Sequence, residues 1–418
     1  MRFKSEAFDV FQFLSEEYKY NDHQLHCVLQ FKGKVEEKIL ERAINLSFKA
    51  IPILSSKYVE DTKRPYWESC DFKEVNDYLI VTKDKSSFDD FIVIPTNEFN
   101  GPQVRFCLYG GTICMLAVIM NHMICDAAGF KQYIYLLSDL YSKLYKDNNY
   151  VLDKKINGTR SINIITDNIS SFTKMKILTS RKIVSNKTGH LKFPISHNSD
   201  KKPFIKKYII SKDRYIKIKD YCQKNNFTIN DVFLAAYYRV MFNILKVKHN
   251  DKLNIAIMID MRRHLKNKTI DSLCNLASSV VTGIEYCEKD NFFETACKVK
   301  NDVDLKKNSY FGMKGFLEIE LAFKILSYKT IKKLLKKHFN NPVIGMTNIG
   351  ILDKRKLKFG NTEVEQAFMC GSIKYAPYFQ LALSSFDDTV TLTVNLFGDM
   401  NDQVTVNDFL LQIVDELP

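Results

Sequence analysis

Hydrophobic and polar positions in the first sixty residues predict a helix, a strand and a second helix. The apolar run at residues 25–31 is followed by Lys32-Gly33-Lys34, which is the pattern of a strand closed by a turn. The second helix is predicted from residue 35 toward residue 50, because apolar side chains recur there at helical spacing: Ile39, Leu40, Ala43, Ile44 and Phe48. Pro52 ends this helix, since the residue before a proline disfavours the α conformation.

A hairpin with a buried second strand is predicted near residue 110. Apolar segments at residues 103–109 and 113–120 flank Gly110-Gly111, as expected of two strands joined by a turn. The second segment is continuously apolar, which is typical of a strand covered on both faces. A helix with one apolar face follows at residues 128–145.

The second half of the chain repeats this mixture of strands and helices. Strands are predicted at residues 204–211, 253–259, 343–347, 379–385 and 389–396, and helices at 212–225, 228–246, 290–337 and 405–417. Thr228, with Asp231 three places on, is the expected N-cap of the second of these helices. The polar stretch between the halves predicts a connection. We therefore expect an α/β protein (α+β mixed) with an N-terminal lobe at 1–175, a connection at 176–205 and a C-terminal lobe at 206–418.

Length and composition fit a two-domain globular protein. A chain of 418 residues is too long for one ordinary core, and 45% of its residues are hydrophobic. The formal net charge of +13 attracts anions in general, but no nucleic-acid-binding module is recognisable, so nucleic acid is not an expected partner. The basic helical segment 332–338 is either a solvated helix face or a contact for coenzyme A phosphates or an acidic carrier protein.

The cysteine spacing and the lack of long apolar runs favour a protein of the reducing cytosol. None of the ten cysteines forms a C-x-x-C pair, so the spacing of a zinc site is missing and no metal is expected. Free thiols fit a reducing cytosol. No stretch reaches the length of a membrane span, and the N-terminus lacks an apolar signal core. We expect a cytoplasmic protein without stable membrane insertion.

The segment that follows the continuously apolar strand carries the candidate chemistry. His122 comes directly after the strand, Asp126 stands four residues later, and small residues then lead into the next helix. A histidine held at a strand end, with an ordinary pKa near neutrality, suits a general base that takes a proton from a hydroxyl or an amine. The same spacing also fits a structural histidine followed by an aspartate that caps the helix.

Ordered matches in both halves resemble the His-x-x-x-Asp superfamily of chloramphenicol acetyltransferase, peptide-synthetase condensation domains, plant BAHD enzymes and alcohol acetyltransferases. Residues 121–129 resemble its active-site motif, and further matches cover nearly the whole chain: residues 29–43, 50–54, 101–105, 227–236, 259–263 with Asn275, and 346–350 with 359–360. The resemblance implies two lobes, each a mixed sheet flanked by helices, with the active site in a tunnel between them.

The resemblance also implies roles for individual residues. His122 would be the general base, and Asp126 would point away from substrate in an ion pair, with Arg262 as its expected partner and Arg263 as the alternative. Thr347 and Asn348 lie where relatives place a side chain near the tetrahedral oxyanion. Gly129 would let the helix pack close to the catalytic turn.

The implied reaction is transfer of an acyl group from a thioester to a small-molecule alcohol or amine. Acyl-coenzyme A or acyl-phosphopantetheine on a carrier protein would be the donor, with no permanently bound cofactor, and we expect a monomer. Condensation domains carry a histidine where this chain has Asn121, and the plant signature D-F-G-W-G is replaced by residues 358–362, which argues against a plant-type enzyme. A catalytically silent condensation-like domain that binds a carrier protein or scaffold is the alternative.

Overall fold

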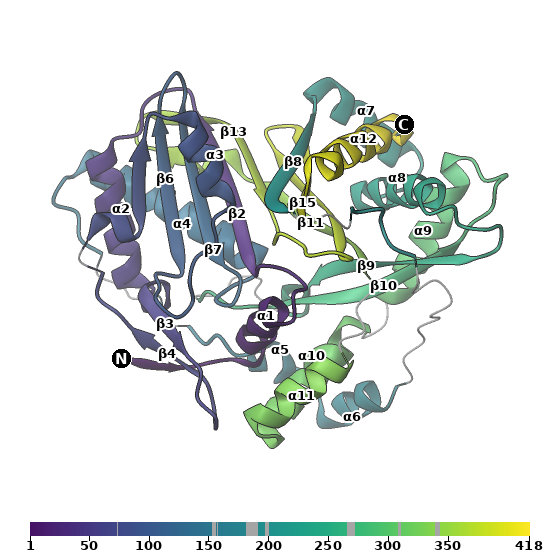
Figure 1. The fold of residues 1–418 in the computed structure, drawn as a ribbon, viewed down its shortest axis with the longest axis horizontal. Coiled ribbons are helices and arrows are strands. Elements are labelled where there is room, and N and C mark those ends of the chain that lie inside the picture. Colours follow the sequence, from purple (N-terminus) through teal and green to yellow (C-terminus); the bar gives the residue numbers. More distant parts are fainter. Residues whose placement is uncertain are drawn as a thin grey trace.

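Two six-stranded sheets lie side by side and form two lobes in the computed structural model (Figure 1). The structure describes residues 1–418 except 73, 153–155, 157, 181–190, 197–199, 266–271, 308–310 and 339–342. Both sheets are mixed and flanked by helices, so the predicted α/β class and the two-lobed arrangement are confirmed.

The N-terminal sheet has the strand order β12-β13-β2-β7-β6-β5. Its strands are β2 (Gln24–Phe31), β5 (Leu79–Thr82), β6 (Val104–Gly110), β7 (Cys114–Asn121), β12 (Lys358–Phe359) and β13 (Thr362–Cys370). All neighbours are antiparallel except β5 and β6. The predicted hairpin is present as β6 and β7, and β7 is buried almost throughout, as its apolar sequence indicates.

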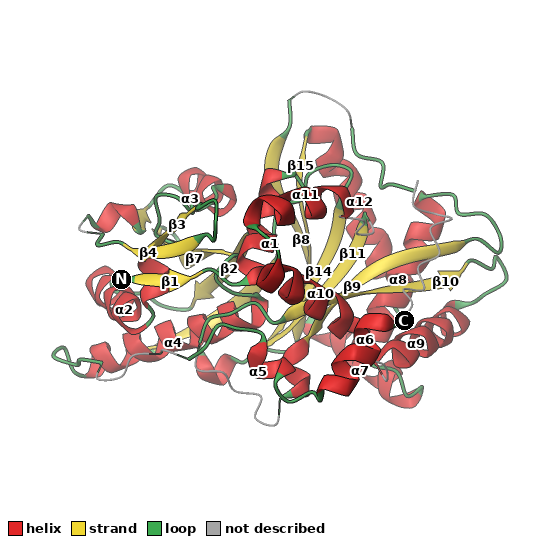
Figure 2. Cartoon of the chain, turned by 90° about the horizontal axis from the view of Figure 1, so that it is seen from below, coloured by secondary structure: helices red, strands yellow, loops and turns green. Residues whose placement is uncertain are grey.

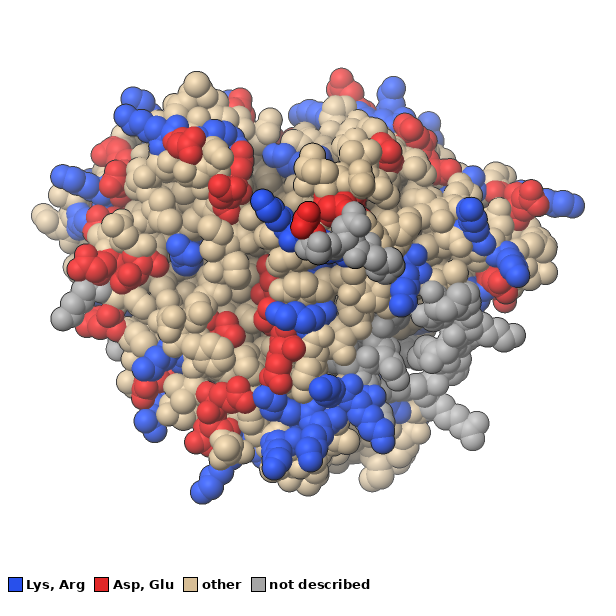
Figure 3. Space-filling view, in the orientation of Figure 1, with Lys and Arg blue, Asp and Glu red and all other residues tan. Residues whose placement is uncertain are grey.

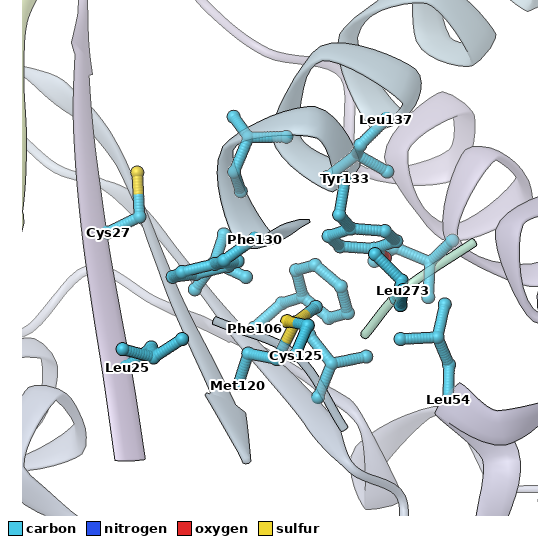
Figure 4. Packing of buried hydrophobic residues seen from close by; sticks show 14 of the residues in the cluster. Leu25, Cys27, Leu54, Phe106, Met120, Cys125, Phe130, Tyr133, Leu137 and Leu273 are labelled. Carbon is cyan, nitrogen blue, oxygen red and sulfur yellow. The ribbon is translucent and has the colours of Figure 1, made fainter. Parts of the chain in front are cut away.

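Helices cover both faces of this sheet. α2 (Glu37–Ala50) and α4 (Ala127–Lys146) pack together on one face, and α3 (Lys85–Val93) lies on the other. Figure 4 shows the α4 side chains of Phe130, Tyr133 and Leu137 among residues of the strands. Alternate residues of β2 divide between the faces: Leu25 and Cys27 belong to this core, whereas Val28 belongs to the core under α3.

The C-terminal sheet has the strand order β10-β9-β11-β14-β15-β8. Its strands are β8 (Lys202–Ile210), β9 (Lys252–Asp260), β10 (Ala277–Glu285), β11 (Ile344–Leu352), β14 (Phe379–Phe386) and β15 (Thr389–Gly398). The helices α7 (Lys212–Lys224), α8 (Ile229–Ile244), α9 (Phe292–Lys307) and α12 (Met400–Glu416) pack on it. α8 begins with the predicted capping box, in which Thr228 and Asp231 exchange hydrogen bonds.

Strands β12 and β13 cross from the second half of the chain to the first lobe. Their residues were expected in the C-terminal lobe, but β13 pairs with β2 over its length, with Met369 opposite Cys27. Phe359 anchors the crossing, because its ring is 1% exposed and lies 5.1 Å from the ring of Phe31 and 5.3 Å from that of Tyr141. Residues of the second half therefore complete the N-terminal sheet.

The remaining elements belong neither to the two large sheets nor to the helices that cover them. They are β1 (Arg2–Lys4), β3 (Ser56–Val59) and β4 (Tyr66–Ser69) in a small sheet, the helices α1 (Ala7–Glu17), α5 (Asn163–Thr166), α6 (Ser171–Thr179), α10 (Phe311–Ile325) and α11 (Tyr328–His338), and four short 3-10 helices at Pro52–Ser55, Val75–Asp77, Met261–His264 and Lys354–Lys356. α1 and α10, which Figure 2 shows near the junction of the lobes, meet through the rings of Phe8 and Phe316, 4.6 Å apart.

Three helices replace the single helical stretch predicted at 290–337, namely α9, α10 and α11. The predicted connection holds part of α6, and its residues 181–190 and 197–199 lie outside the described residues. Among the described helices, none is both long enough and apolar enough to span a bilayer.

Replacing Phe359 with alanine tests the crossing of β12 and β13. We expect Phe359→Ala to lower the free energy of unfolding by about 3–5 kcal/mol, because it empties a fully packed site between Phe31 and Tyr141. Urea denaturation followed by circular dichroism measures the change. Phe172→Ala is the control, since Phe172 is 79% exposed and should leave the midpoint unchanged. Equal midpoints for both variants would contradict the anchoring role.

Candidate active site

His122 lies where the two lobes meet. It follows β7 directly, and its N–H donates to the carbonyl of His23 at 2.7 Å. Its half-buried side chain lines a cavity of about 190 Å³. Leu25 borders this cavity from the N-terminal lobe, and Thr347 and Gln380 border it from the C-terminal lobe. The cavity is therefore built by both halves of the chain, with the imidazole at its wall.

Asn275 fixes the orientation and the tautomer of this imidazole. Its Nδ2 donates to the carbonyls of His122 and Met123, both at 2.9 Å, and its Oδ1 lies 3.2 Å from His122 Nδ1. Because Oδ1 can only accept, Nδ1 must carry the proton. Nε2 is then the nitrogen with a lone pair, and no protein group in the described part of the chain hydrogen-bonds it.

Burial shifts the titration of His122 toward the neutral form. It lowers the pKa of His122 below the ordinary value of 6.5, and the cation of Lys374 acts in the same direction. The carbonyl of His122, the carboxylate of Asp126 and the amide of Asn275 oppose this shift. The imidazole is thus a neutral base at neutral pH.

Asp126 both caps α4 and joins the lobes. Its Oδ1 accepts from the N–H of Gly129 at 2.9 Å, as an N-cap does. Its Oδ2 accepts from Arg262 Nη1 and from the N–H of Leu276, both at 2.7 Å. The carboxylate is 2% exposed and does not line the cavity. Asp126 therefore holds the turn after β7 and does not face the cavity.

Arg262 makes the ion pair with Asp126 that the resemblance implied for it in preference to Arg263. Its guanidinium also contacts Asp260 Oδ1 at 3.2 Å and the carbonyl of Cys274 at 3.3 Å. Burial disfavours the charge, but the carboxylates of Asp126 and Asp260 outweigh it, so the pKa of Arg262 is raised. Arg263 lies elsewhere, beside a second hollow that Asn348 also borders.

A second arginine, Arg160, holds the same turn and was not identified from the sequence. Its guanidinium binds both carboxylate oxygens of Asp9 at 2.8 and 2.9 Å and donates to the carbonyl of Ile124 at 3.1 Å. Its Nε donates to the carbonyl of Leu273 at 2.8 Å. Arg160 stands in the irregular part of the chain, where no periodic pattern or motif marks it.

Close packing accounts for Gly129 of the motif, and a hydrogen bond to the turn accounts for Asn121. A Cβ on Gly129 would lie 2.9 Å from the Cβ of Cys125, so only glycine fits where α4 meets the turn. Asn121 is fully buried, and its Oδ1 accepts from the N–H of Met123 at 2.9 Å. Asn121 does not line the cavity.

The structure brings Thr347 to the cavity of His122 but not Asn348. Gly345, Thr347 and Ile349 line the cavity, since alternate residues of β11 share a face. Asn348 points away, is exposed, and its Oδ1 accepts from the N–H of Gly350 at 2.9 Å across an irregularity in the pairing of β11. Asn348 therefore does not line the cavity of His122, and Thr347 is the residue of this pair that does.

Breaking the buried ion pair should destabilise the protein more than breaking a surface pair. We expect Arg262→Met to lower the free energy of unfolding by about 3–5 kcal/mol, because it leaves the carboxylate of Asp126 buried and uncompensated. The control is Arg355→Met, which removes an arginine 90% exposed in its pair with Asp353 and should leave the urea midpoint unchanged. The same midpoint shift in both variants would refute a special cost at Asp126.

Comparisons with known proteins rest on structure alone. No family model matches the chain, and no curated protein matches it in sequence. Among solved structures, TRI3 trichothecene 15-O-acetyltransferase from Fusarium sporotrichioides is 14% identical with a TM-score of 0.67, covering 100% of this chain and 96% of that one. Polyketide synthase associated protein 5 from Mycobacterium tuberculosis is 10% identical with a TM-score of 0.68, covering 98% and 97%.

A third similar structure is the first condensation domain of the calcium-dependent antibiotic synthetase, in complex with a substrate analogue. It is 13% identical with a TM-score of 0.68, and the match covers 100% of this chain and 96% of that one. Identities this low establish the fold. The chain has the two-lobed fold of condensation domains and chloramphenicol acetyltransferase-like enzymes.

Proposed function

We propose that this chain is an acyltransferase that moves an acyl group from a thioester to an alcohol or an amine, with His122 as the general base. The observation that carries the proposal is the tautomer of His122: Nδ1 is held by Asn275, so Nε2 is the basic nitrogen in a cavity built by both lobes. The fold shared with an acetyltransferase and with condensation domains supports the same chemistry.

The proposed step needs no covalent acyl-enzyme. Nε2 of His122 takes the proton from the acceptor O–H or N–H while the acceptor attacks the thioester carbonyl. The tetrahedral intermediate then expels the thiolate, which receives that proton from the imidazolium. The hydroxyl of Thr347 lines the same cavity and is the proposed donor to the developing oxyanion. Asp126 and Arg262 act by holding the turn.

The donor in this proposal is acyl-coenzyme A or an acyl-phosphopantetheine on a carrier protein. Lysines gather on the face over α10 and α11 (Figure 3). Those of α11 that are exposed are Lys329, Lys333, Lys336 and Lys337. Coenzyme A phosphates and an acidic carrier protein are both anionic, so a basic face supports either. Lys332 serves another purpose, since its ammonium binds Glu17 and Glu60.

Asn121 gives no support to the alternative that the chain is a catalytically silent condensation-like domain. The side chain at this position is buried and bonds the turn rather than the cavity. Condensation domains carry a histidine at this position. Because the side chain here does not line the cavity, having asparagine instead changes no residue of the cavity wall.

His122→Ala tests the proposal. In a panel of acyl-coenzyme A donors against alcohols and amines, we expect the variant to lose at least about 100-fold in acyl transfer, because the general base is gone. Thiol release and product mass measure the rate. His249→Ala is the matched control, since His249 is exposed and does not line the cavity. If the folded His122 variant keeps the wild-type rate, the base assignment is wrong and a binding module becomes the better description.

The pH profile provides a separate test. His122 acts as a base only when neutral, and its pKa lies below 6.5, chiefly because of burial. We therefore expect kcat/KM to be retained as the pH falls through 6.5 and to be lost only at lower pH. The slope of initial rate against acceptor concentration at saturating donor, measured from pH 5 to 8, gives kcat/KM for the acceptor and checks this. An acid limb centred above 6.5 would contradict the neutral, buried imidazole.

A further inference from the structure

Lys374 presents a positive charge to the cavity from a backbone held by both lobes. Its main chain bridges to Asn21 on one side and to Leu396 on the other. Its N–H donates to the carbonyl of Asn395 at 3.0 Å, and its carbonyl accepts from the N–H of Phe397 at 2.9 Å. Its side chain lines the same cavity as His122. The ammonium is thus placed by the junction of the lobes.

The charge at the cavity wall is positive only. Of the described residues that line it, Lys374 alone bears a full charge, and none is Asp or Glu. The rest of the lining is uncharged and includes the polar side chains of Ser279, Thr347 and Gln380. A wall of this kind complements a negatively charged ligand.

No protein carboxylate takes up this ammonium directly. Among the described residues, no hydrogen bond or ion pair is made by its Nζ. The carboxylate of Asp22 acts on it from a distance, but its Oδ1 is engaged by the N–H groups of Gln24 at 3.1 Å and Ile373 at 2.9 Å. Burial lowers the pKa of Lys374 to about 8, and Asp22 opposes that shift, so the group is largely protonated at pH 7.

The ammonium of Lys374 is half-buried at the cavity wall and has no carboxylate partner among the described residues, which points to an anionic ligand that would pair with it. We propose that the cavity takes a substrate bearing a carboxylate, bound by the ammonium of Lys374 beside His122. The inference deepens the proposed function by naming the substrate class. The carboxylate could belong to the acceptor or to the acyl group, since both meet in this cavity.

Binding of small carboxylates and their neutral amides tests the inference without turnover. The probes are matched pairs: phenylacetate and phenylacetamide, hexanoate and hexanamide, succinate and succinamide. We expect the wild-type protein to bind at least one carboxylate about 10-fold or more tightly than its amide, as a charge-assisted contact provides. Lys374→Met should abolish this preference, and Lys374→Arg should retain it. Isothermal titration calorimetry measures the dissociation constants.

Three further variants test whether the carboxylate preference depends on Lys374 in particular. Lys38→Met removes an exposed lysine of α2 and should keep the wild-type preference. His122→Ala should keep it too, so loss of catalysis and loss of anion binding are distinguishable. Circular dichroism establishes that Lys374→Met is folded, and Lys374→Gln replaces it if it is not. Absence of a carboxylate preference in the wild type, or its persistence in the folded Lys374 variant, overturns the inference.

Rates of acyl transfer show whether the carboxylate belongs to the acyl group or to the acceptor. Succinyl-coenzyme A and butyryl-coenzyme A form one pair of donors, and an amino acid and its amide form one pair of acceptors. If the acyl group carries the charge, Lys374→Met raises KM for succinyl-coenzyme A about 10-fold and leaves butyryl-coenzyme A unchanged. If the acceptor carries it, the amino acid alone is affected. An equal fall in kcat for charged and neutral members of both pairs would show a general oxyanion role and overturn the inference.

Discussion

A single buried carboxylate, that of Asp126, ties the candidate base to both halves of the molecule. It starts α4 in one lobe and receives a guanidinium and a main-chain N–H from the other. Because a buried charge has no solvent to replace a lost partner, this arrangement tolerates little displacement. The turn that carries His122 is therefore fixed relative to Asn275, which lies on the opposite lobe and sets the imidazole tautomer. Arg160, which is paired with Asp9 of α1, reinforces the same turn by donating to the carbonyl of Ile124.

Local patterns were sufficient for much of the fold, whereas the candidate site rested on a resemblance that spans both halves of the chain. The continuous apolar run of β7, the helical spacing of α2 and the capping box of α8 are all short-range signals, and each element formed where predicted. The pairing of Asp126 with Arg262 followed from a resemblance that spans both halves of the chain. Spacing alone gave the capping role of Asp126, and the structure shows that the cap and the ion pair coexist on its two oxygens.

The features that sequence reasoning missed depend on contacts between distant residues. Nothing local in β13 indicates that it pairs with β2, more than three hundred residues earlier in the chain. Neighbouring residues of a strand point to opposite faces, so Thr347 and Asn348 of β11 do not both face the cavity, and only the pairing of β11 in the sheet decides which of them does. Arg160 and Lys374 stand outside any motif, so only the fold shows what surrounds them.

The crossing of β12 and β13 means that the chain is not divisible at the connection between its halves. A fragment that stopped before residue 358 would leave β2 as an exposed edge, with unpaired main-chain groups and an apolar flank where Phe359 and Val364 now pack. Such an edge is a template for pairing with other chains. During synthesis the sheet of the first lobe is therefore incomplete until residue 370 has been made, and until then that lobe is exposed to misassembly.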